Sequence, residues 1–425
     1  TLFRSGETPG SATAVVPALE TLVRLEGDTA SGEPVRHIRF QDLHFAHTSW
    51  RLPREGRSVP QAAIVSDAAI EVVGGEHITI DRCAITHTGG YGIAFGWGSR
   101  DNAVAESELV DLGAGGIKIG RADAPTWSEV GAVPPLDLVP ARHRITDNLI
   151  AHGGRQHPAG VGVWIGHSPH NTVARNTIRD LYYTGISVGW SWGYEKSPAF
   201  NNRIRANRIA HIGRGVLSDM SGVYTLGVSP GTAVTENYVH HVTSHDYGGW
   251  GLYTDEGSSY ILMRDNLVHH TTTGGFHQHY GRANRITNNI FAFSASDQLQ
   301  RTRAEDHLSF RFDHNLVYYR DGPLLGSNWS GSGFAMDHNL YWKEGGGQVL
   351  FPDSLSLSEW QHERNQDMGS RVADPGFAAP EDGDFRLTDD SPALELGFKP
   401  FDYRDAGRDQ PAELTGELPP VPAAF

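Results

Sequence analysis

The sequence predicts an all-β protein, built as a single right-handed parallel β-helix with a cap at each end. Two repeated patterns and a glycine-rich composition indicate this fold. In the first pattern a glycine precedes residues that alternate between apolar and variable, which is typical of a strand with one buried face. The pattern recurs at intervals of about 23 to 46 residues, at 92–95, 116–119, 162–165, 185–188, 222–225, 251–254 and 275–278.

The second pattern is an asparagine followed two positions later by an apolar or aromatic residue. In a parallel β-helix each coil lies about 4.8 Å from the next, so equivalent residues form ladders along the molecule. We expect asparagine here because it tolerates the left-handed backbone of a tight turn and can bond the asparagines above and below. This ladder is therefore predicted to be structural, and Cys83, at the equivalent place in an earlier coil, is expected to be buried. Its asparagines are Asn148, Asn176, Asn207, Asn237, Asn266, Asn289, Asn315 and Asn339.

The composition favours the same fold and argues against some partners. The chain has 425 residues, of which 50 are glycine, and a formal net charge of −15. A solenoid grows by adding coils, so it escapes the usual limit on the size of one core. The negative charge argues against nucleic acid or an anionic membrane surface as partner, and no apolar run reaches the roughly 18 residues of a membrane span. We expect a neutral carbohydrate or another small ligand and no cofactor, and leave the oligomeric state open.

The repeats divide the chain into three regions. Residues 1–34 are expected to form cap strands at 13–16 and 21–25, and to continue from an upstream segment because the chain begins with Thr1 and not with methionine. Residues 35–345 are predicted to form the β-helix, and residues 346–425 a C-terminal cap with an extended, proline-rich tail. Two irregular insertions, at 48–65 and 121–140, are expected to form lips of a groove, since insertions in a solenoid collect on its functional face.

The outward residues of the glycine-led strands change character along the chain. If the first apolar residue of each strand points inward, the alternate residues point outward. One outward row is Ala94, Lys118, Trp164, Ser187, Tyr224, Tyr253 and His277, and the next is Gly96, Gly120, Gly166, Gly189, Leu226, Asp255 and His279. Small residues in the early coils and tyrosine, aspartate and histidine in the later ones predict a concave floor that deepens toward Asp255.

Asp255 is the best candidate for a catalytic carboxylate. Glycosidic cleavage needs one carboxylic acid that protonates the leaving oxygen and one carboxylate that attacks the sugar or activates water. Asp219 is a candidate for the second group. It stands seven positions from Asp255 in the coil alignment, which is about 23 Å along a straight strand, so only a loop at 213–221 that folds back over the face could bring the two together. Three further acidic residues are alternatives: Glu256, Glu305 and Asp306.

His277 and His279 alternate on one strand, and such a pair can bind zinc. A third ligand would have to come from His240, His241, His269 or His270, and none stands at a recognisable spacing. We therefore predict no metal, and expect the two histidines to bind substrate and to orient Asp255. The other side chains expected to contact sugar are aromatic platforms and polar groups: Tyr253, Tyr224, Trp190, Trp192, Trp250, Trp164, His167, Arg303 and Glu305.

Several motifs together resemble one family. They are GHS at 166–168, LYYTGISVGW at 181–190, LSDMSGVYTLG at 217–227, GGWGLYTDEGSS at 248–259, GGFHQHYG at 274–281, and a closing ADPGF, DFRL and SPAL. From about Ala14 to Phe401 the chain is similar to right-handed parallel β-helix proteins of bacterial polysaccharide utilisation, most nearly those around glycoside hydrolase family 141. The resemblance implies fucosidase-like or xylanase-like activity and a catalytic aspartate pair, for which Asp219 and Asp255 are the best positional matches. It also implies a secreted or periplasmic bacterial protein.

We therefore predict a glycoside hydrolase that acts on a plant or microbial polysaccharide or its oligosaccharides. One alternative is a polysaccharide lyase on the same fold, which would need cations on the outer face to stabilise an enolate. Lys118 is the only cation in the two outward rows, although the arginines at 301–303 could compensate if their loop folds over the groove. The other alternative, a non-catalytic carbohydrate-binding β-helix, predicts exposed aromatics without a closed cluster of carboxylates.

Overall fold

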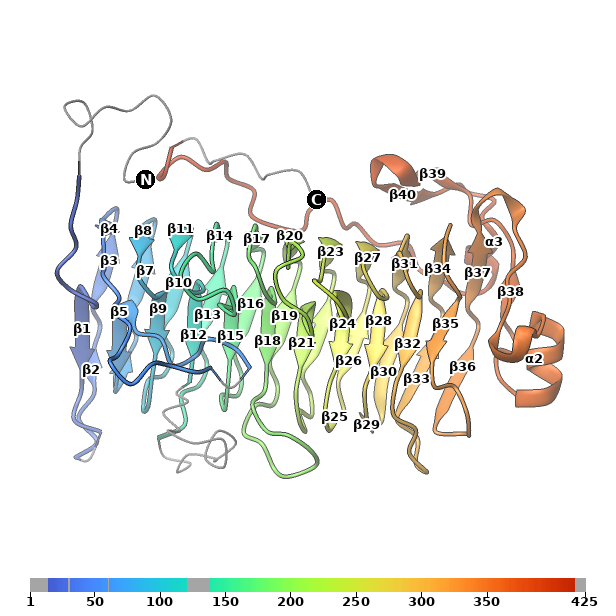
Figure 1. Cartoon of the computed structure of the whole chain (residues 1–425), viewed down its shortest axis with the longest axis horizontal. Coiled ribbons are helices and arrows are strands. Elements are labelled where there is room, and N and C mark those ends of the chain that lie inside the picture. Colours follow the sequence, from blue (N-terminus) through green and yellow to red (C-terminus); the bar gives the residue numbers. More distant parts are fainter. Residues whose placement is uncertain (1–13, 30, 60, 121–137, 417–425) are drawn as a thin grey trace.

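The computed structural model describes residues 14–29, 31–59, 61–120 and 138–416. In these residues the chain winds coil after coil into three long parallel sheets, and Figure 1 shows the coils stacked along one axis from β1 to β37. The predicted right-handed parallel β-helix is confirmed. None of the described helices has the length and apolar character needed to cross a membrane.

The bounds of the strands are as follows, each sheet in spatial order. The first sheet contains β1 (Val23–Glu26), β5 (Ala68–Val73), β9 (Tyr91–Phe95), β12 (Ile117–Ile119), β15 (Val163–Ile165), β18 (Ile186–Val188), β21 (Ser221–Thr225), β24 (Trp250–Thr254), β28 (Phe276–Gln278), β32 (Leu299–Arg301) and β35 (Leu325–Ser327). The second contains β3 (Arg39–Gln41), β7 (Thr79–Asp81), β10 (Ala103–Ala105), β13 (Arg144–Thr146), β16 (Thr172–Ala174), β19 (Arg203–Arg205), β22 (Ala233–Thr235), β26 (Leu262–Arg264), β30 (Asn284–Thr287), β33 (Phe310–Asp313) and β36 (Phe334–Asp337). The third contains β4 (His44–Ala46), β8 (Ala84–Thr88), β11 (Glu108–Leu112), β14 (Leu149–Ala151), β17 (Thr177–Arg179), β20 (Arg208–Ile212), β23 (Tyr238–Val242), β27 (Leu267–Thr271), β31 (Ile290–Ala292), β34 (Leu316–Tyr319), β37 (Leu340–Lys343) and β38 (Arg371–Val372).

Shorter elements complete the described chain. Two short parallel pairs join β2 (Val35–Arg36) to β6 (Gly75–Glu76) and β25 (Ser258–Ser259) to β29 (Gly281–Arg282), and β39 (Phe377–Ala379) pairs antiparallel with β40 (Asp384–Leu387). The helices are η2 (Glu344–Gly346), η3 (Pro352–Ser354), α2 (Leu357–Arg364), η4 (Pro380–Asp382) and α3 (Pro392–Glu395).

The inward row of the first sheet has the register that the sequence predicts. Each member pairs with its equivalent in the next coil, and all of the side chains are fully buried. The row consists of Ile93, Ile117, Val163, Ile186, Val223, Leu252, Phe276 and Leu299. Since successive side chains of a strand point to opposite faces, the alternate residues face away from the core.

The asparagine ladder lies in the turn between the second and third sheets. Asn176 accepts hydrogen bonds from the backbone N–H and the side-chain amide of Asn148, at 3.0 and 2.9 Å, and its own amide donates to Asn207 at 2.9 Å. The expectation that asparagine takes the left-handed backbone was wrong, because that conformation belongs to the residue before it, such as Asp147 with φ 60° and Arg175 with φ 52°. The buried asparagine is needed for its side chain, which satisfies buried backbone groups.

Both ends of the solenoid differ in detail from the expected caps. β1 pairs in parallel with β5 as the first strand of the first sheet, whereas residues 14–16 form no strand. Thr13 and residues 121–137 of the second insertion lie outside the described residues, and the first insertion is irregular, as expected.

The C-terminal region contains a helix, α2, that was not expected. A capping box between Ser356 and Glu359 begins it, and the buried Trp360 anchors it.

A C-terminal strap, residues 398–416, runs back along the third sheet toward earlier coils (Figure 1). The backbone N–H of Gly407 donates to the carbonyl of Ala206 at 2.9 Å. Further on, the backbone N–H groups of Glu413 and Thr415 donate to the carboxylate of Glu108 on β11, both at 2.9 Å. The strap therefore joins the last part of the described chain to one of the first coils.

Candidate active site

A cleft of about 600 Å³ lies on the outer face of the first sheet, over the neighbouring strands β21, β24 and β28. Eight residues proposed from the sequence line it: Asp219, Asp255, Glu256, Tyr253, Trp250, Trp192, His277 and His279. The later coils thus carry the floor that the outward rows predict.

Asp255 directly follows β24, and only 6% of its surface is exposed. Its Oδ2 accepts a hydrogen bond from the Tyr224 hydroxyl at 2.6 Å, and its Oδ1 accepts one from the Tyr253 hydroxyl at 2.7 Å. Tyr224 and Tyr253 are neighbours in the outward row, on paired strands. The two tyrosines therefore fix both oxygens of Asp255 in one orientation.

Asp219 reaches the same cleft because its loop folds back over the sheet. The backbone at Asp219 is left-handed, with φ 52°. Its N–H donates to the carbonyl of Tyr247 at 3.1 Å, and its carbonyl accepts from the Tyr183 hydroxyl at 2.9 Å. These contacts turn the side chain toward Tyr253, so the separation expected along a straight strand does not apply.

The Tyr253 hydroxyl connects the two carboxyl groups. It lies 3.3 Å from Asp219 Oδ1 and 2.7 Å from Asp255 Oδ1, which places these two oxygens no more than about 6 Å apart, the sum of the two distances. A hydroxyl has one proton to donate, so the short bond goes to ionised Asp255 and a protonated Asp219 can donate to the tyrosine oxygen. The three groups form a continuous hydrogen-bonded chain.

Burial and mutual repulsion set the protonation of the pair. Burial, followed by the charge of Asp255, raises the pKa of Asp219 to about 6. Burial also raises the pKa of Asp255, but the bonds from Tyr224 and Tyr253 and the nearby His279 oppose this rise. The carboxylate with more donors holds its charge better, so the shared proton resides on Asp219.

The two histidines lie on the far side of Tyr253 from Tyr224. The His277 ring stacks on the Tyr253 ring, with centroids 4.6 Å apart, and burial holds the pKa of His277 well below its usual value. His277 Nε2 and His279 Nδ1 both contact the Thr302 hydroxyl, at 3.0 and 2.7 Å. Trp250 packs against both Tyr253 and His277, so the aromatic wall of the cleft is rigid.

Glu256 lines the cleft, and its backbone bonds Asp255 while its side chain bonds a neighbouring tyrosine. Its Oε2 accepts from the Tyr280 hydroxyl at 3.1 Å. Arg303 lies over the ring of the same tyrosine, with its guanidinium carbon 4.3 Å from the centroid. Glu305 accepts from Tyr194 and from the backbone N–H of Gly281, so neither Arg303 nor Glu305 lines the cleft.

Three further candidates lie away from the cleft. Trp164 and Trp190 are almost fully buried and pack edge to face, with centroids 5.4 Å apart. Trp164 stands in the predicted outward row, whereas Trp190 follows β18. Both pack into the hydrophobic core, so they offer no platform to a sugar. His167 is also buried, and burial lowers its pKa to about 4.

Other lining residues were not proposed from the sequence: Gln61, Tyr247, Gln300 and Thr302. Gln300 lies on β32, where it pairs with His277. Gln61 belongs to the first insertion, and its amide donates to the Tyr224 hydroxyl at 3.0 Å. The irregular composition of that insertion was the available signal for it. Tyr247 is half-exposed at the rim and Trp192 packs on Trp190, and for Tyr247 no repeat gave a signal.

The arrangement has the chemistry of acid-assisted displacement on a polar, aromatic-lined floor. One carboxyl group is protonated and the other ionised, and both face the same space. Among the described residues, those that line the cleft include no lysine or arginine. Arg301 was expected on a loop that could supply a cation, but it ends strand β32, is buried, and donates to the carbonyl of Ser330 at 2.9 Å.

Fold and site together define the class, a right-handed parallel β-helix with a carboxylate-bearing cleft on its first sheet. Residues 140–330 match the model of the family described as periplasmic copper-binding protein (NosD). No curated protein matches the sequence.

Solved structures resemble the chain over most of its length. A structure titled glycoside hydrolase is 30% identical, with a TM-score of 0.57, over 63% of this chain and 49% of that one. A lacto-N-biosidase of family GH136 from Eubacterium ramulus is 10% identical, with a TM-score of 0.45, over 75% and 59%. A tailspike protein of E. coli bacteriophage HK620, in complex with a pentasaccharide, is 8% identical, with a TM-score of 0.48, over 77% and 57%. The chain thus spans about half the length of the solved structures it matches.

Proposed function

We propose that the protein is a glycoside hydrolase in which Asp219 is the general acid and Asp255 the carboxylate that attacks the sugar. The observation that carries this proposal is the Tyr253 hydroxyl between the two carboxyl groups, in a cleft where burial raises both pKa values. The similarity at 30% identity to a structure titled glycoside hydrolase supports it.

In the proposed reaction a glycosidic oxygen lies beside Asp219 and the anomeric carbon beside Asp255. Asp219 gives its proton to the leaving oxygen while an oxygen of Asp255 forms a bond to the anomeric carbon. Water then attacks the glycosyl–aspartate ester, ionised Asp219 takes a proton from that water, and Asp255 leaves as a carboxylate. Tyr224 and Tyr253 orient Asp255 through its two oxygens.

The spacing of the pair favours retention of anomeric configuration. Retaining enzymes hold their carboxyl groups about 5 to 5.5 Å apart, and inverting enzymes about 6.5 to 9.5 Å apart. The limit of about 6 Å between the Oδ1 atoms lies below the inverting range.

Hydrolysis is favoured over elimination by the charges of the cleft. A lyase acting on uronates needs a cation near the acidic sugar and the enolate, and no described lining residue supplies one. Lys118 lies on an earlier coil and donates to the carbonyls of Ile64 and Ser66. We therefore infer products with new reducing ends and no ultraviolet-absorbing unsaturated sugar.

For the substrate we propose only a class of carbohydrate, and for the place of action only a compartment. Trp250, Trp192 and Tyr247 offer aromatic faces to sugar rings, and the family resemblance directs the first assays to fucosides and xylans. The match to a family described as periplasmic supports action in the periplasm or outside the cell.

The test screens the chain against a panel of aryl glycosides and oligosaccharides and then compares Asp255→Asn with Asp219→Asn. Asp255→Asn should lose turnover on every substrate. Asp219→Asn should lose turnover on natural glycans but retain the first step on substrates whose aryl leaving group needs no proton. Azide added to Asp219→Asn should then give a glycosyl azide of retained configuration.

Asp111→Asn is the matched control. Asp111 is an exposed aspartate with the same left-handed backbone as Asp219, at φ 58°, and its replacement should leave activity unchanged. Full activity in Asp255→Asn, or an unsaturated product from any substrate, would overturn the proposal.

A further inference from the structure

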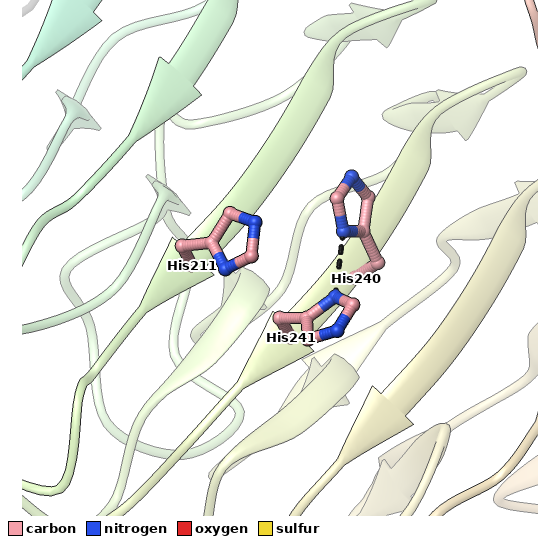
Figure 2. A group of neighbouring side chains, drawn as sticks. All are labelled: His211, His240 and His241. Carbon is pink, nitrogen blue, oxygen red and sulfur yellow. Dashed lines mark hydrogen bonds between the residues drawn. The ribbon is translucent and has the colours of Figure 1, made fainter. Parts of the chain in front are cut away.

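Histidines accumulate in the middle of the third sheet, on the neighbouring strands β20, β23 and β27, away from the cleft of the first sheet. Figure 2 shows His211, His240 and His241, with the two adjacent histidines of β23 facing each other and His211 beside them from the preceding strand. One ring nitrogen from each of the three lies within 4.8 Å of the other two. In the described residues this is the one group of three or more such side chains with that geometry.

The contacts within the group bring imidazole nitrogens together instead of separating them. His240 Nδ1 and His241 Nδ1 are 2.8 Å apart, so the pair shares a single proton between two lone pairs. The His211 ring stacks on the His241 ring, with centroids 4.7 Å apart. In the next coil, His269 and His270 stack under His240 and His241 at 5.2 and 4.9 Å, which holds the two rings of β23 in place.

The three imidazoles are in the form that binds metal. Burial lowers the pKa of each of them, and for His211 and His240 neighbouring histidines and arginines lower it further. They are therefore neutral at neutral pH and carry free lone pairs. His240 Nε2 is buried without a hydrogen-bond partner among the described residues, so one nitrogen of this ring is not committed to another protein group.

A second cleft, of about 590 Å³, gives access to the group. It lies between the third sheet and the C-terminal strap, and its lining includes His211, His240, Arg208, Asp405 and Asp409. Four arginines also line this cleft, Arg179, Arg208, Arg404 and Arg408, against the two aspartates of the strap. Arg408 pairs with Glu108 and Arg404 with Asp402, so part of this positive charge is neutralised. An ion can thus enter from solvent without crossing the core.

We propose that His211, His240 and His241 bind one divalent transition-metal ion of the Zn²⁺ or Cu²⁺ kind. Three imidazoles suit these ions, whereas Mg²⁺ and Ca²⁺ require oxygen ligands that the group does not supply. Zinc–nitrogen bonds are about 2.0 to 2.1 Å long, so the half-buried His211 ring turns toward the other two by on the order of 1 Å. His240 and His241 each keep one N–H, on the ring nitrogen that does not bind the ion, so the bond between them is replaced without a net loss of a proton. The site is structural, since it lies on a different sheet from Asp219 and Asp255.

The test titrates Zn²⁺ and Cu²⁺ separately into the chain, produced without a histidine tag. Calorimetry should show one ion bound per chain, and Cu²⁺ should give a visible d–d band with nitrogen ligation in its electron paramagnetic resonance spectrum. An ion that binds only the folded state should raise the unfolding temperature, while equal Mg²⁺ should not. Hydrolytic activity should be unchanged by chelator, which separates this proposal from the proposed function.

The variants His211→Asn and His241→Asn should each weaken binding by more than about tenfold. Asparagine is chosen because both positions have a left-handed backbone, with φ 53° and 55°, which it tolerates. The control is His37→Asn with His77→Asn, a stacked pair with centroids 5.0 Å apart and φ 59° and 56°, where no described group of three forms.

Three results would overturn the proposal: no saturable binding of either ion, affinity unchanged in both cluster variants, or an equal loss in the control. If one cluster variant does not fold, the other carries the comparison. The shift in unfolding temperature of the unaltered chain, measured against Mg²⁺, tests the site independently of any substitution.

Discussion

The proton held by Asp219 and Asp255 determines the pH dependence that we expect of the activity. Catalysis requires Asp219 protonated and Asp255 ionised. Because the pKa of Asp219 is raised to about 6, kcat/KM should fall as the pH rises through about 6. On aryl substrates that need no acid, this alkaline limb should disappear in Asp219→Asn. A pH–rate profile of both forms checks this, and an alkaline limb that persists in the variant would assign the acid elsewhere.

The same raised pKa has a consequence for stability. When the pKa of a carboxyl group is higher in the folded than in the unfolded state, its protonated form stabilises the fold. This contribution to the free energy of unfolding is complete at pH values below the unfolded pKa, and it is lost as the pH rises through the folded pKa. Relative to the unaltered protein, Asp219→Asn should therefore gain stability between pH 4 and pH 8, by up to about 3 kcal/mol. Denaturant unfolding at both pH values measures the gain, and Asp111→Asn, which is exposed, should show no such trend.

Tyr253 is the positioning residue between the two carboxyl groups. Tyr253→Phe keeps the ring, which packs against Trp250 and His277, but removes the hydroxyl that bonds both aspartates. We expect kcat to fall by about 10- to 100-fold with little change in KM, and the alkaline limb to move. Tyr91→Phe is the control, since Tyr91 is a buried tyrosine of the same sheet whose hydroxyl bonds the Val161 N–H instead. Equal losses in both variants would point to a general effect of removing a buried hydroxyl.

At the scale of strands, the register of the first sheet could be predicted because one physical rule fixes it. Alternation places Val223 inward and Tyr224 outward, and stacking then repeats that choice in each coil. The meeting of Asp219 with Asp255 could not be predicted in this way. It depends on a left-handed turn at Asp219 and on a bond to Tyr247, both in loops whose lengths differ from coil to coil.

Burial of the outward row was also beyond the strand pattern. Trp164 occupies an outward position, yet its side chain is fully buried, and the pattern says nothing about what lies over a strand. The asparagine ladder could be predicted from the recurrence of asparagine, but the position of the left-handed residue could not. That residue was assigned one position too late, because turn propensity and side-chain bonding predict the same residue type.

The stability of the protein should fall strongly when a charged side chain replaces an asparagine of the ladder. In Asn207 the side-chain amide donates to the carbonyl of Val173 and to Asn237, both within a fully buried row. Asn207→Asp replaces these donors by a carboxylate among acceptors, and we expect a loss of more than about 3 kcal/mol in unfolding free energy. Asn201→Asp makes the same change at an exposed residue of the same coil and should cost less than about 0.5 kcal/mol. Chemical denaturation of both variants compares them, and similar costs would refute a structural role for the buried amides.

At the scale of the whole molecule, the strap depends on one buried carboxylate. Burial tends to raise the pKa of Glu108, but the Thr415 hydroxyl and the backbone N–H groups of the strap outweigh it and hold the pKa below its usual value. The stabilising contribution of this contact is therefore present at neutral pH and lost as the pH falls through the folded pKa. Arg408 adds an ion pair at 3.0 Å.

Glu108→Gln should release the strap. The amide can accept at one oxygen only, so at least one of the N–H groups that now bond Glu108 loses its partner. We expect proteases to cut within residues 405–416 of the variant at neutral pH, and within those of the unaltered protein only in acid. Glu106→Gln, two residues away and outside these bonds, is the control. A strap that resists cleavage in Glu108→Gln would show that its other contacts suffice.

A solenoid whose coils touch only their neighbours comes apart from its ends, and the strap changes where a mechanical load would act. A pull on the chain just beyond residue 416 reaches Glu108 and the coil of β11 first, because the contacts of Thr415 and Glu413 lie there. The coils between β11 and the start of the strap then lie inside the tied span and are not the first to bear tension. Under force the molecule should therefore give way at the anchor of the strap in one step, and only afterwards unwind coil by coil.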